Sequence, residues 1–190
     1  MPPPKNRSSL LSPEVAFGET EESVCPLSVP PEIRNRLVLL DVPYYGFDGR
    51  THDGQLIVDQ ELALDVQFLF LMLQGMYFPI ASMVPISSHG WSDERSMAAN
   101  NTSAWNYRFI AGSNPPRLSK HAYGRAIDLN PWQNPCRSQG VWSPEGATYD
   151  PEAPGTIVLD SPVVKLFQSR GWVCGVNWQE PFDPQHFEKP

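Results

Sequence analysis

Cysteine and charge are scarce in this chain of 190 residues. Its three cysteines, Cys25, Cys136 and Cys174, are too few and too far apart for a disulfide framework or a CxxC metal site. Charged residues make up 18% of the sequence, below the roughly 25% of an average soluble domain, and the formal net charge is −7. Because no cluster of lysine and arginine interrupts this acidic balance, the sequence argues against a nucleic-acid partner.

Long hydrophobic runs are missing as well. The most apolar stretch, residues 62–86, is interrupted by Asp65, Gln67 and Gln74, so we expect no membrane span. The N-terminal residues contain no apolar segment of the kind that a secretory signal peptide needs. We therefore expect either delivery by another route or a mature form whose signal has been removed.

Proline is the residue present in excess. Its 21 copies are about 11% of the chain, against a usual figure of about 5%, which predicts many turns and rigid loops. The length suits one domain. Residues 1–30 are rich in Pro, Ser and Glu and predict a poorly ordered or strapping arm, and residues 31–190 predict the globular domain.

The hydrophobic pattern predicts an α+β protein. Predicted helices lie at 59–74, 92–99 and 161–169, and predicted strands at 37–40, 80–86, 105–110, 125–130 and 171–178. The first helix is apolar on most sides, so we expect it to be buried in the core. Since no regular βαβ alternation occurs, we expect a small, mostly antiparallel sheet flanked by helices.

Two of the four histidines lie in segments dense with other potential ligands. His121 precedes Asp128 by seven residues, and Gly124 lies between them, where the chain must turn or approach another segment closely. Asp183 precedes His186 by three residues. Two imidazoles and a carboxylate suit an open three-ligand zinc site, which leaves Asp183 as general base. The spacing also fits a loop histidine hydrogen-bonded to a nearby aspartate, so both interpretations stay open.

The two segments together resemble a known family. The pattern Ser119-x-His121-x-x-Gly124-x-Ala126-x-Asp128, followed by Asp183-x-x-His186-Phe187, is similar to the zinc D-alanyl-D-alanine carboxypeptidases, D,D-dipeptidases and L-alanyl-D-glutamate endolysin peptidases. The Hedgehog signalling domain shares their fold. The resemblance extends over about residues 46–188 and implies a Hedgehog-like fold with Pro-rich loops.

The resemblance implies a zinc-dependent peptidase with one Zn²⁺ per chain. His121, Asp128 and His186 would hold the metal, and Asp183 would be the catalytic base. The implied substrate is the stem peptide of peptidoglycan, cleaved as a D,D-carboxypeptidase or an endopeptidase in the periplasm or cell wall. An antibacterial effector, with an immunity protein as partner, and a prophage endolysin are the roles we expect. The alternative is a zinc-bound, non-catalytic binding module of the same fold, against which the presence of Asp183 argues.

Other polar residues near these motifs complete the implied site. We choose Arg108 to polarise the scissile carbonyl, because it follows an Asn-rich segment in a predicted strand; a structural ion pair is its alternative role. Ser119 is expected to position a ligand or a substrate carboxylate. Asn101 and Ser103 are uncharged donors that would bind the peptide backbone, with helix capping as the alternative.

The sequence departs from the family pattern at two cysteines. Cys136 stands where relatives often carry an aromatic residue. Cys174 begins the segment Cys174-Gly175-Val176, where relatives often carry Trp-Gly-Gly. This double replacement suggests the hypothesis of a Cys136–Cys174 disulfide. It would tie the loop after Asp128 to the strand before Asp183.

Overall fold

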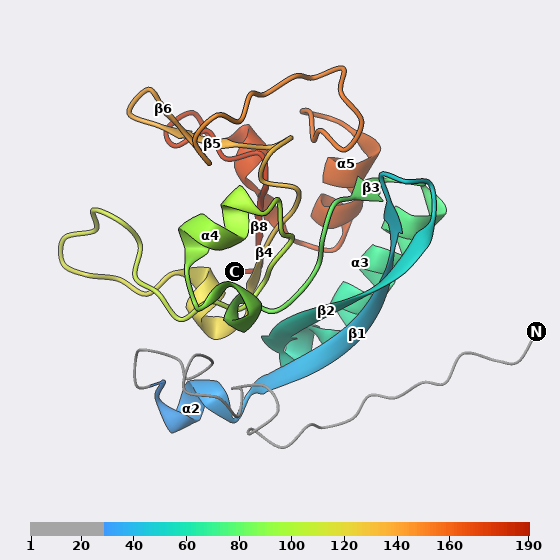
Figure 1. The fold of residues 1–190 in the computed structure, drawn as a ribbon. Coiled ribbons are helices and arrows are strands. Elements are labelled where there is room, and N and C mark those ends of the chain that lie inside the picture. The colour runs from blue at the N-terminus through green and yellow to red at the C-terminus, as the bar shows by residue number, and fades with distance from the viewer. Residues whose placement is uncertain (1–28) are drawn as a thin grey trace, which may run out of the picture.

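Residues 29–190 are described in the computed structural model, whose arrangement is shown in Figure 1. The predicted arm of residues 1–30 lies almost wholly outside this part of the chain, so the division at residue 30 stays a prediction. Four α-helices are described in this part: α2 (Pro31–Arg34), α3 (Ala63–Gly75), α4 (Asp93–Ala98) and α5 (Pro162–Ser169). Its strands are β1 (Leu37–Gly46), β2 (Thr51–Asp59), β3 (Pro79–Ile80), β4 (Ala126–Asp128), β5 (Cys136–Ser138), β6 (Val141–Ser143), β7 (Val173–Cys174) and β8 (His186–Glu188).

Three small sheets organise residues 29–190. Their strand orders are β2-β1-β3, β4-β8-β7 and β5-β6. Every pairing between these strands is antiparallel except that of β1 with β3. The predicted α+β class and the mostly antiparallel pairing are therefore confirmed, although the strands divide among three sheets instead of forming one.

The long β1–β2 hairpin and α3 form one side of the molecule (Figure 1). Val66, Leu69, Phe70 and Leu73 of α3 are buried in the main core. The opposite face of this helix is also apolar but meets solvent, with Leu64 81% exposed. The helix is confirmed, but the expectation that most of its sides are buried is wrong. With 13 residues it is the longest helix between residues 29 and 190, and no helix there combines the length and the apolar character that crossing a membrane demands.

The second sheet brings distant parts of the chain together. β4 pairs with β8, and β7 pairs with the other edge of β8. α5 begins as predicted, because the Ser161 hydroxyl accepts a hydrogen bond from the Val164 amide and Pro162 occupies the first turn. Phe167 of this helix packs on Phe187 of β8, with ring centroids 4.1 Å apart. The core under α5 thus supports the strand that follows Asp183.

Two predicted strands are largely absent because side chains and separate segments take their backbone hydrogen bonds. In 80–86, only the first residue belongs to a strand, and both the N–H and the C=O of Val84 bond to the Asn101 amide. In 105–110, Trp105 N–H donates to Ile57 while Asn106 N–H donates to His121, so no single partner strand continues the ladder. Similarly, 171–178 is a strand only at Val173–Cys174.

The hypothesis of a Cys136–Cys174 disulfide is wrong, because both cysteines are free. The Cys174 side chain is part of the main core, where burial raises the pKa of its thiol to about 12. Burial and the negative charge of Asp183 raise the pKa of the Cys136 thiol above its ordinary value. The two thiols therefore lie in different surroundings, Cys174 in the main core and Cys136 near Asp183.

Candidate metal centre

A short 3₁₀ helix, Lys120–Tyr123, carries His121 into the interior. The Ser119 hydroxyl caps this helix by accepting the His121 amide hydrogen at 3.2 Å. Gly124 ends it with a φ of 67°, and a Cβ there would lie 2.6 Å from the backbone nitrogen of Asp59. Gly124 therefore meets both expectations of the sequence, since the chain turns and also passes close to another segment.

Strand pairing places the other two candidate ligands opposite each other. In the antiparallel register of β4 and β8, Asp128 faces His186. Backbone hydrogen bonds in both directions join Asp128 to Ser103, at 3.1 and 2.9 Å. Asp128 is thus held from both sides, and Ser103 contributes through its backbone to the position of this carboxylate.

The three side chains converge on one point. His121 Nε2 lies 3.1 Å from Asp128 Oδ2 and 3.2 Å from His186 Nδ1, and His186 Nδ1 lies 2.9 Å from Asp128 Oδ1. One ligand atom from each residue falls within 4.8 Å of the others, and all three residues are buried. Convergence of two imidazole nitrogens and a carboxylate in so small a volume suits a divalent cation.

The outer nitrogen of each imidazole already has a partner. His121 Nδ1 lies 2.5 Å from the Ala104 carbonyl oxygen, and His186 Nε2 lies 3.2 Å from Glu188 Oε2. Donation of these N–H groups leaves His121 Nε2 and His186 Nδ1 as lone pairs directed at the common point. The residues present therefore fit a zinc ion, with three protein donors.

The residues of this cluster change one another's pKa values. Burial opposes ionisation of Asp128, yet His121 and His186 hold its pKa well below the ordinary value. Burial also opposes the charged form of His186, but hydrogen bonds to Asp128 and Glu188 raise its pKa to about 10. Because a metal ligand must be deprotonated, metal binding is expected to release a proton from this cluster.

Asp183 lies beside the cluster on the segment that leads into β8. Burial raises the pKa of its carboxyl to about 6, and the negative charge of Asp128 acts in the same direction. Its Oδ1 atom is buried and has no hydrogen-bond partner among residues 29–190. A Cβ on Gly175 would lie 2.3 Å from the Asp183 carbonyl oxygen, so the glycine permits this close approach. A carboxylate with a raised pKa and an unpaired oxygen is suited to accept a proton near neutral pH.

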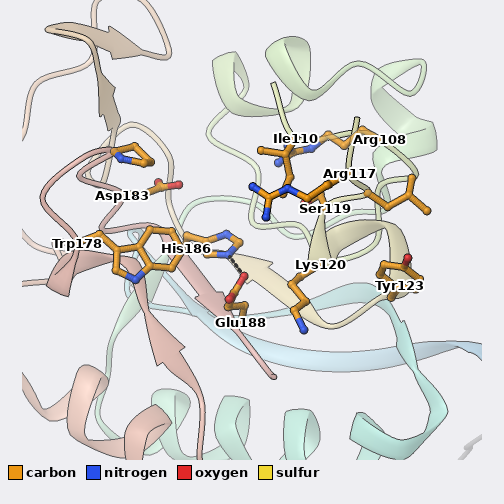
Figure 2. Close-up of a pocket in the computed structure, with 12 residues that line it drawn as sticks. Arg108, Ile110, Arg117, Ser119, Lys120, Tyr123, Trp178, Asp183, His186 and Glu188 are labelled. Atoms are coloured by element: carbon orange, nitrogen blue, oxygen red, sulfur yellow. Dashed lines mark hydrogen bonds and ion pairs between the residues drawn. The ribbon is translucent and has the colours of Figure 1, made fainter. Parts of the chain in front are cut away.

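A pocket of about 440 Å³ opens onto Asp183 and His186 (Figure 2). Arg108 lies on the opposite wall, where its Nε is 3.4 Å from Asp93 Oδ2. Its positive charge partly offsets the rise that burial causes in the pKa of Asp183. The ion pair that the sequence left as an alternative for Arg108 is thus present together with a place in the pocket wall.

Of the other predicted polar residues, Ser119 lies in the pocket wall and Asn101 does not. Ser119 lines the pocket. Asn101 is fully buried, and its amide makes hydrogen bonds with Ser82, Val84 and Ser96. These bonds hold Asn101 away from the pocket, so this geometry offers no support for its predicted contact with substrate.

Sequence reasoning missed further residues of the pocket. Glu188 bonds His186, and Trp178 packs its ring 5.3 Å from the His186 imidazole. Glu188 could have been found, because residues two apart on a strand share one face. Nothing in the sequence pattern placed Trp178 there, because it approaches from outside the strand.

The comparison with known families agrees with this geometry. Residues 113–189 match the family model described as D-alanyl-D-alanine carboxypeptidase, and this part of the chain contains His121, Asp128, Asp183 and His186. Residues 113–189 are therefore similar to the peptidases of the D-alanyl-D-alanine carboxypeptidase family, and this segment carries a buried His-Asp-His group that could hold one metal ion. No curated protein and no solved structure matches the chain, so the Hedgehog-like fold stays a prediction.

Proposed function

We propose that this protein is a zinc-dependent peptidase that hydrolyses the stem peptides of peptidoglycan. The observation that carries the proposal is the convergence of His121, Asp128 and His186 beside Asp183 at the foot of an open pocket. The family is zinc-dependent, and the family model includes this whole set of residues. A purely structural metal site would have no use for the adjacent carboxylate with its raised pKa.

The residues divide the chemical work between them. Zinc held by the two imidazoles and Asp128 would supply Lewis acidity to water and to the scissile carbonyl. Asp183 accepts a proton from the attacking water and delivers it to the departing amine. Arg108 donates hydrogen bonds to the oxygen on which negative charge develops, and its contact with Asp93 holds the guanidinium in the pocket wall.

Digestion of defined muropeptides, followed by mass spectrometry, tests the proposal. We expect cleavage by the zinc-loaded protein, loss of cleavage with a chelator and recovery when zinc is returned. Asp183→Asn is the matched variant, since it should retain zinc without turnover. Zinc binding without cleavage of any muropeptide would instead support the non-catalytic binding module.

The proposed substrate lies outside the cytoplasmic membrane, so we also propose that the protein acts in the periplasm or cell wall. We propose delivery either as an antibacterial effector or as a prophage endolysin. An effector should be neutralised by an immunity protein that covers the zinc cleft. Expression directed to the periplasm should lyse the host, whereas cytoplasmic expression should not, and equal toxicity in both compartments would contradict this location.

A further inference from the structure

The outer face of α3, on the hairpin side of the molecule, is apolar although it meets solvent (Figure 1). Leu64 and Leu71 on this face are 81% and 60% exposed, and Phe68 and Met72 are exposed beside them. Asp65 is the only charged residue of the helix. A helix on the surface of a monomer usually turns a charged or polar face outward. The outer face of α3 therefore has the composition of a face that a partner covers.

Four residues of α3 form a straight line along this face, and together they are called the α3 seam. They are Leu64, Phe68, Leu71 and Gly75, which follow one another at intervals of four, three and four residues. Because an α-helix has 3.6 residues per turn, this spacing keeps all four on the side opposite the buried Leu73. The same alternation of intervals occurs along the contact line of helices that pair with each other.

The α3 seam is complementary to itself when two copies of the helix pack in antiparallel orientation. In the sequence, the midpoint between Leu64 and Gly75 is also the midpoint between Phe68 and Leu71. A two-fold axis at this point places Leu64 opposite Gly75 of the second copy and Phe68 opposite Leu71 of the second copy. At both ends of the seam a large side chain therefore meets the smallest residue, which lets the two helices approach closely.

The protomer itself does not require a glycine at position 75. The φ angle of Gly75 lies outside the left-handed region, and a Cβ there would have no atom of residues 29–190 within 4 Å. Glycine is also less favourable than alanine within a helix. The approach of a second helix accounts for this residue, because the missing side chain leaves room for Leu64 of the other copy.

The area of the outer face suits a homodimer. Met76 and Tyr77 extend the apolar surface beyond the end of the helix, and Tyr77 is 70% exposed. Together with the apolar residues of α3 they expose roughly 700 Å² of side-chain surface, close to the roughly 800 Å² that each partner buries in an interface of standard size.

The charges around the seam favour a second copy over an anionic membrane. Gln67 and Gln74 on one flank are neutral. On the other flank, Asp65 lies 2.5 Å from Arg170 and 3.7 Å from Lys189, so its charge is balanced within the protomer. Two such faces therefore meet without repulsion between like charges, whereas the formal net charge of −7 disfavours approach to an anionic lipid surface.

We propose that this protein forms a two-fold symmetric homodimer through the α3 seam. The proposal is independent of the proposed peptidase activity, since all residues that line the pocket lie between Arg108 and Glu188. An apolar interface of this modest area dissociates at low protein concentration. Unfolding at submicromolar protein therefore reports on the monomer, in which Leu64 is exposed, and association at higher concentration is measured separately.

Sedimentation velocity of the full chain at about 1 to 100 µM tests the dimer. The native protein should shift with concentration from the 21.3 kDa monomer toward twice this mass. Gly75→Leu should raise the Kd of the dimer at least about 100-fold, because the new side chain occupies the space of Leu64 from the second copy. If the face were only a non-specific apolar patch, the added leucine would instead strengthen association.

An exchange of residues tests the antiparallel register. Leu64→Ala alone should raise the Kd about tenfold, since a large side chain is lost from each end of the seam. Combined with Gly75→Leu, it again pairs a large residue with a small one, so the double variant should associate more tightly than Gly75→Leu alone. Leu159→Ala, at an exposed leucine before α5, is the matched control and should leave the Kd unchanged.

Three outcomes would overturn the proposal. The first is a native protein that stays monomeric at about 100 µM. The second is a Gly75→Leu protein that associates as tightly as the native protein or more tightly; because position 75 opens onto free space in the protomer, this variant should fold, as circular dichroism checks. The third is a monomeric native protein whose thermal midpoint falls in Leu71→Glu, which would show that the face is covered within its own chain.

Discussion

The hairpin side and the site side of this molecule are built on different principles. The hairpin side, β1, β2 and α3, consists of long regular elements with an apolar interface. The site side, residues 100–190, contains strands of two or three residues, and several of its buried groups are polar. Apolar packing stabilises the hairpin side, and it is non-directional. Hydrogen bonds are directional, so they can place each side chain of the site at a defined point.

Asn130 shows how the two sides are joined. Its side chain accepts a hydrogen bond from Ala81 and donates others to Pro79 and Gly155. It therefore connects the residues after α3 with the strand that carries Asp128. The site is held by directional contacts at its margin while the core beneath it supplies most of the burial.

Removal of a metal ligand should have the largest effect. His121→Ala and His186→Ala should lose zinc and essentially all hydrolysis, because each leaves only two protein donors. Zinc should raise the thermal midpoint of the native protein and not of these variants. His52→Ala, at a half-buried histidine on β2 that pairs with Asp48, is the matched control and should keep both zinc and activity, measured by metal analysis and peptide cleavage.

Replacement of the candidate base should separate chemistry from metal binding. Asp183→Asn should lower kcat by about 10²–10⁴, the usual contribution of a general base, with zinc content unchanged. Asp41→Asn is the control on the hairpin side, where the carboxylate only accepts a hydrogen bond from Gln55. Near-native turnover by the Asp183 variant would show that another group is the base.

A pair of leucines in α3 tests the hairpin side. Leu69 is fully buried, so Leu69→Ala should cost about 2–5 kcal/mol of unfolding free energy in urea titrations. Leu64 is 81% exposed, and Leu64→Ala should change it by less than about 0.5 kcal/mol. Both folded proteins should bind zinc as the native protein does. A cost at Leu64 equal to that at Leu69 would mean that the outer face of α3 is covered in solution.

Loss of the hydrogen bonds of Asn130 should lower the free energy of unfolding by less than loss of a core leucine does. Asn130→Ala leaves the Ala81 amide and two carbonyls without their partner, so it should cost about 1–3 kcal/mol. Gln55→Ala, which removes the exposed bond to Asp41, should cost less than about 0.5 kcal/mol. Weaker zinc binding by the Asn130 variant alone would show that this connection also orders the site.

Acidification should have the mildest effect. Since the base must be ionised and its pKa is about 6, kcat/KM should fall as the pH drops through this value, and bound zinc should move the fall to lower pH. The free energy of unfolding should change with pH in the opposite direction. The pKa of Asp183 in the folded protein lies above its ordinary value of 3.8, so protonation of this carboxylate favours the folded state. Asp183→Asn should therefore stabilise the metal-free protein at pH 8, and a loss of stability would contradict the buried charge.

Motif spacing predicted more of the site than periodicity predicted of the fold. His121, Asp128, Asp183 and His186 could be singled out because their two segments together resemble a known family, whereas their spacing alone fitted a hydrogen-bonded loop histidine equally well. The strand expected at 105–110 could not be excluded, since alternating apolar residues do not reveal which segment takes the backbone hydrogen bonds. The pairing of β8 with β4 was equally hidden, because three residues carry almost no periodic signal.

The sequence by itself determined the α+β class and the presence of α3, which depend on residue type and local periodicity, and its resemblance to a known family singled out the four residues proposed for the chemistry. Only the tertiary structure decided that Asp128 faces His186, that Cys136 and Cys174 stay free and that Arg117 shares a pocket wall with Arg108. Those outcomes depend on contacts between residues far apart in the chain, whose geometry is set by packing of the whole molecule. Charged residues are only 18% of the sequence, and the structure shows that two of the arginines among them line the same pocket.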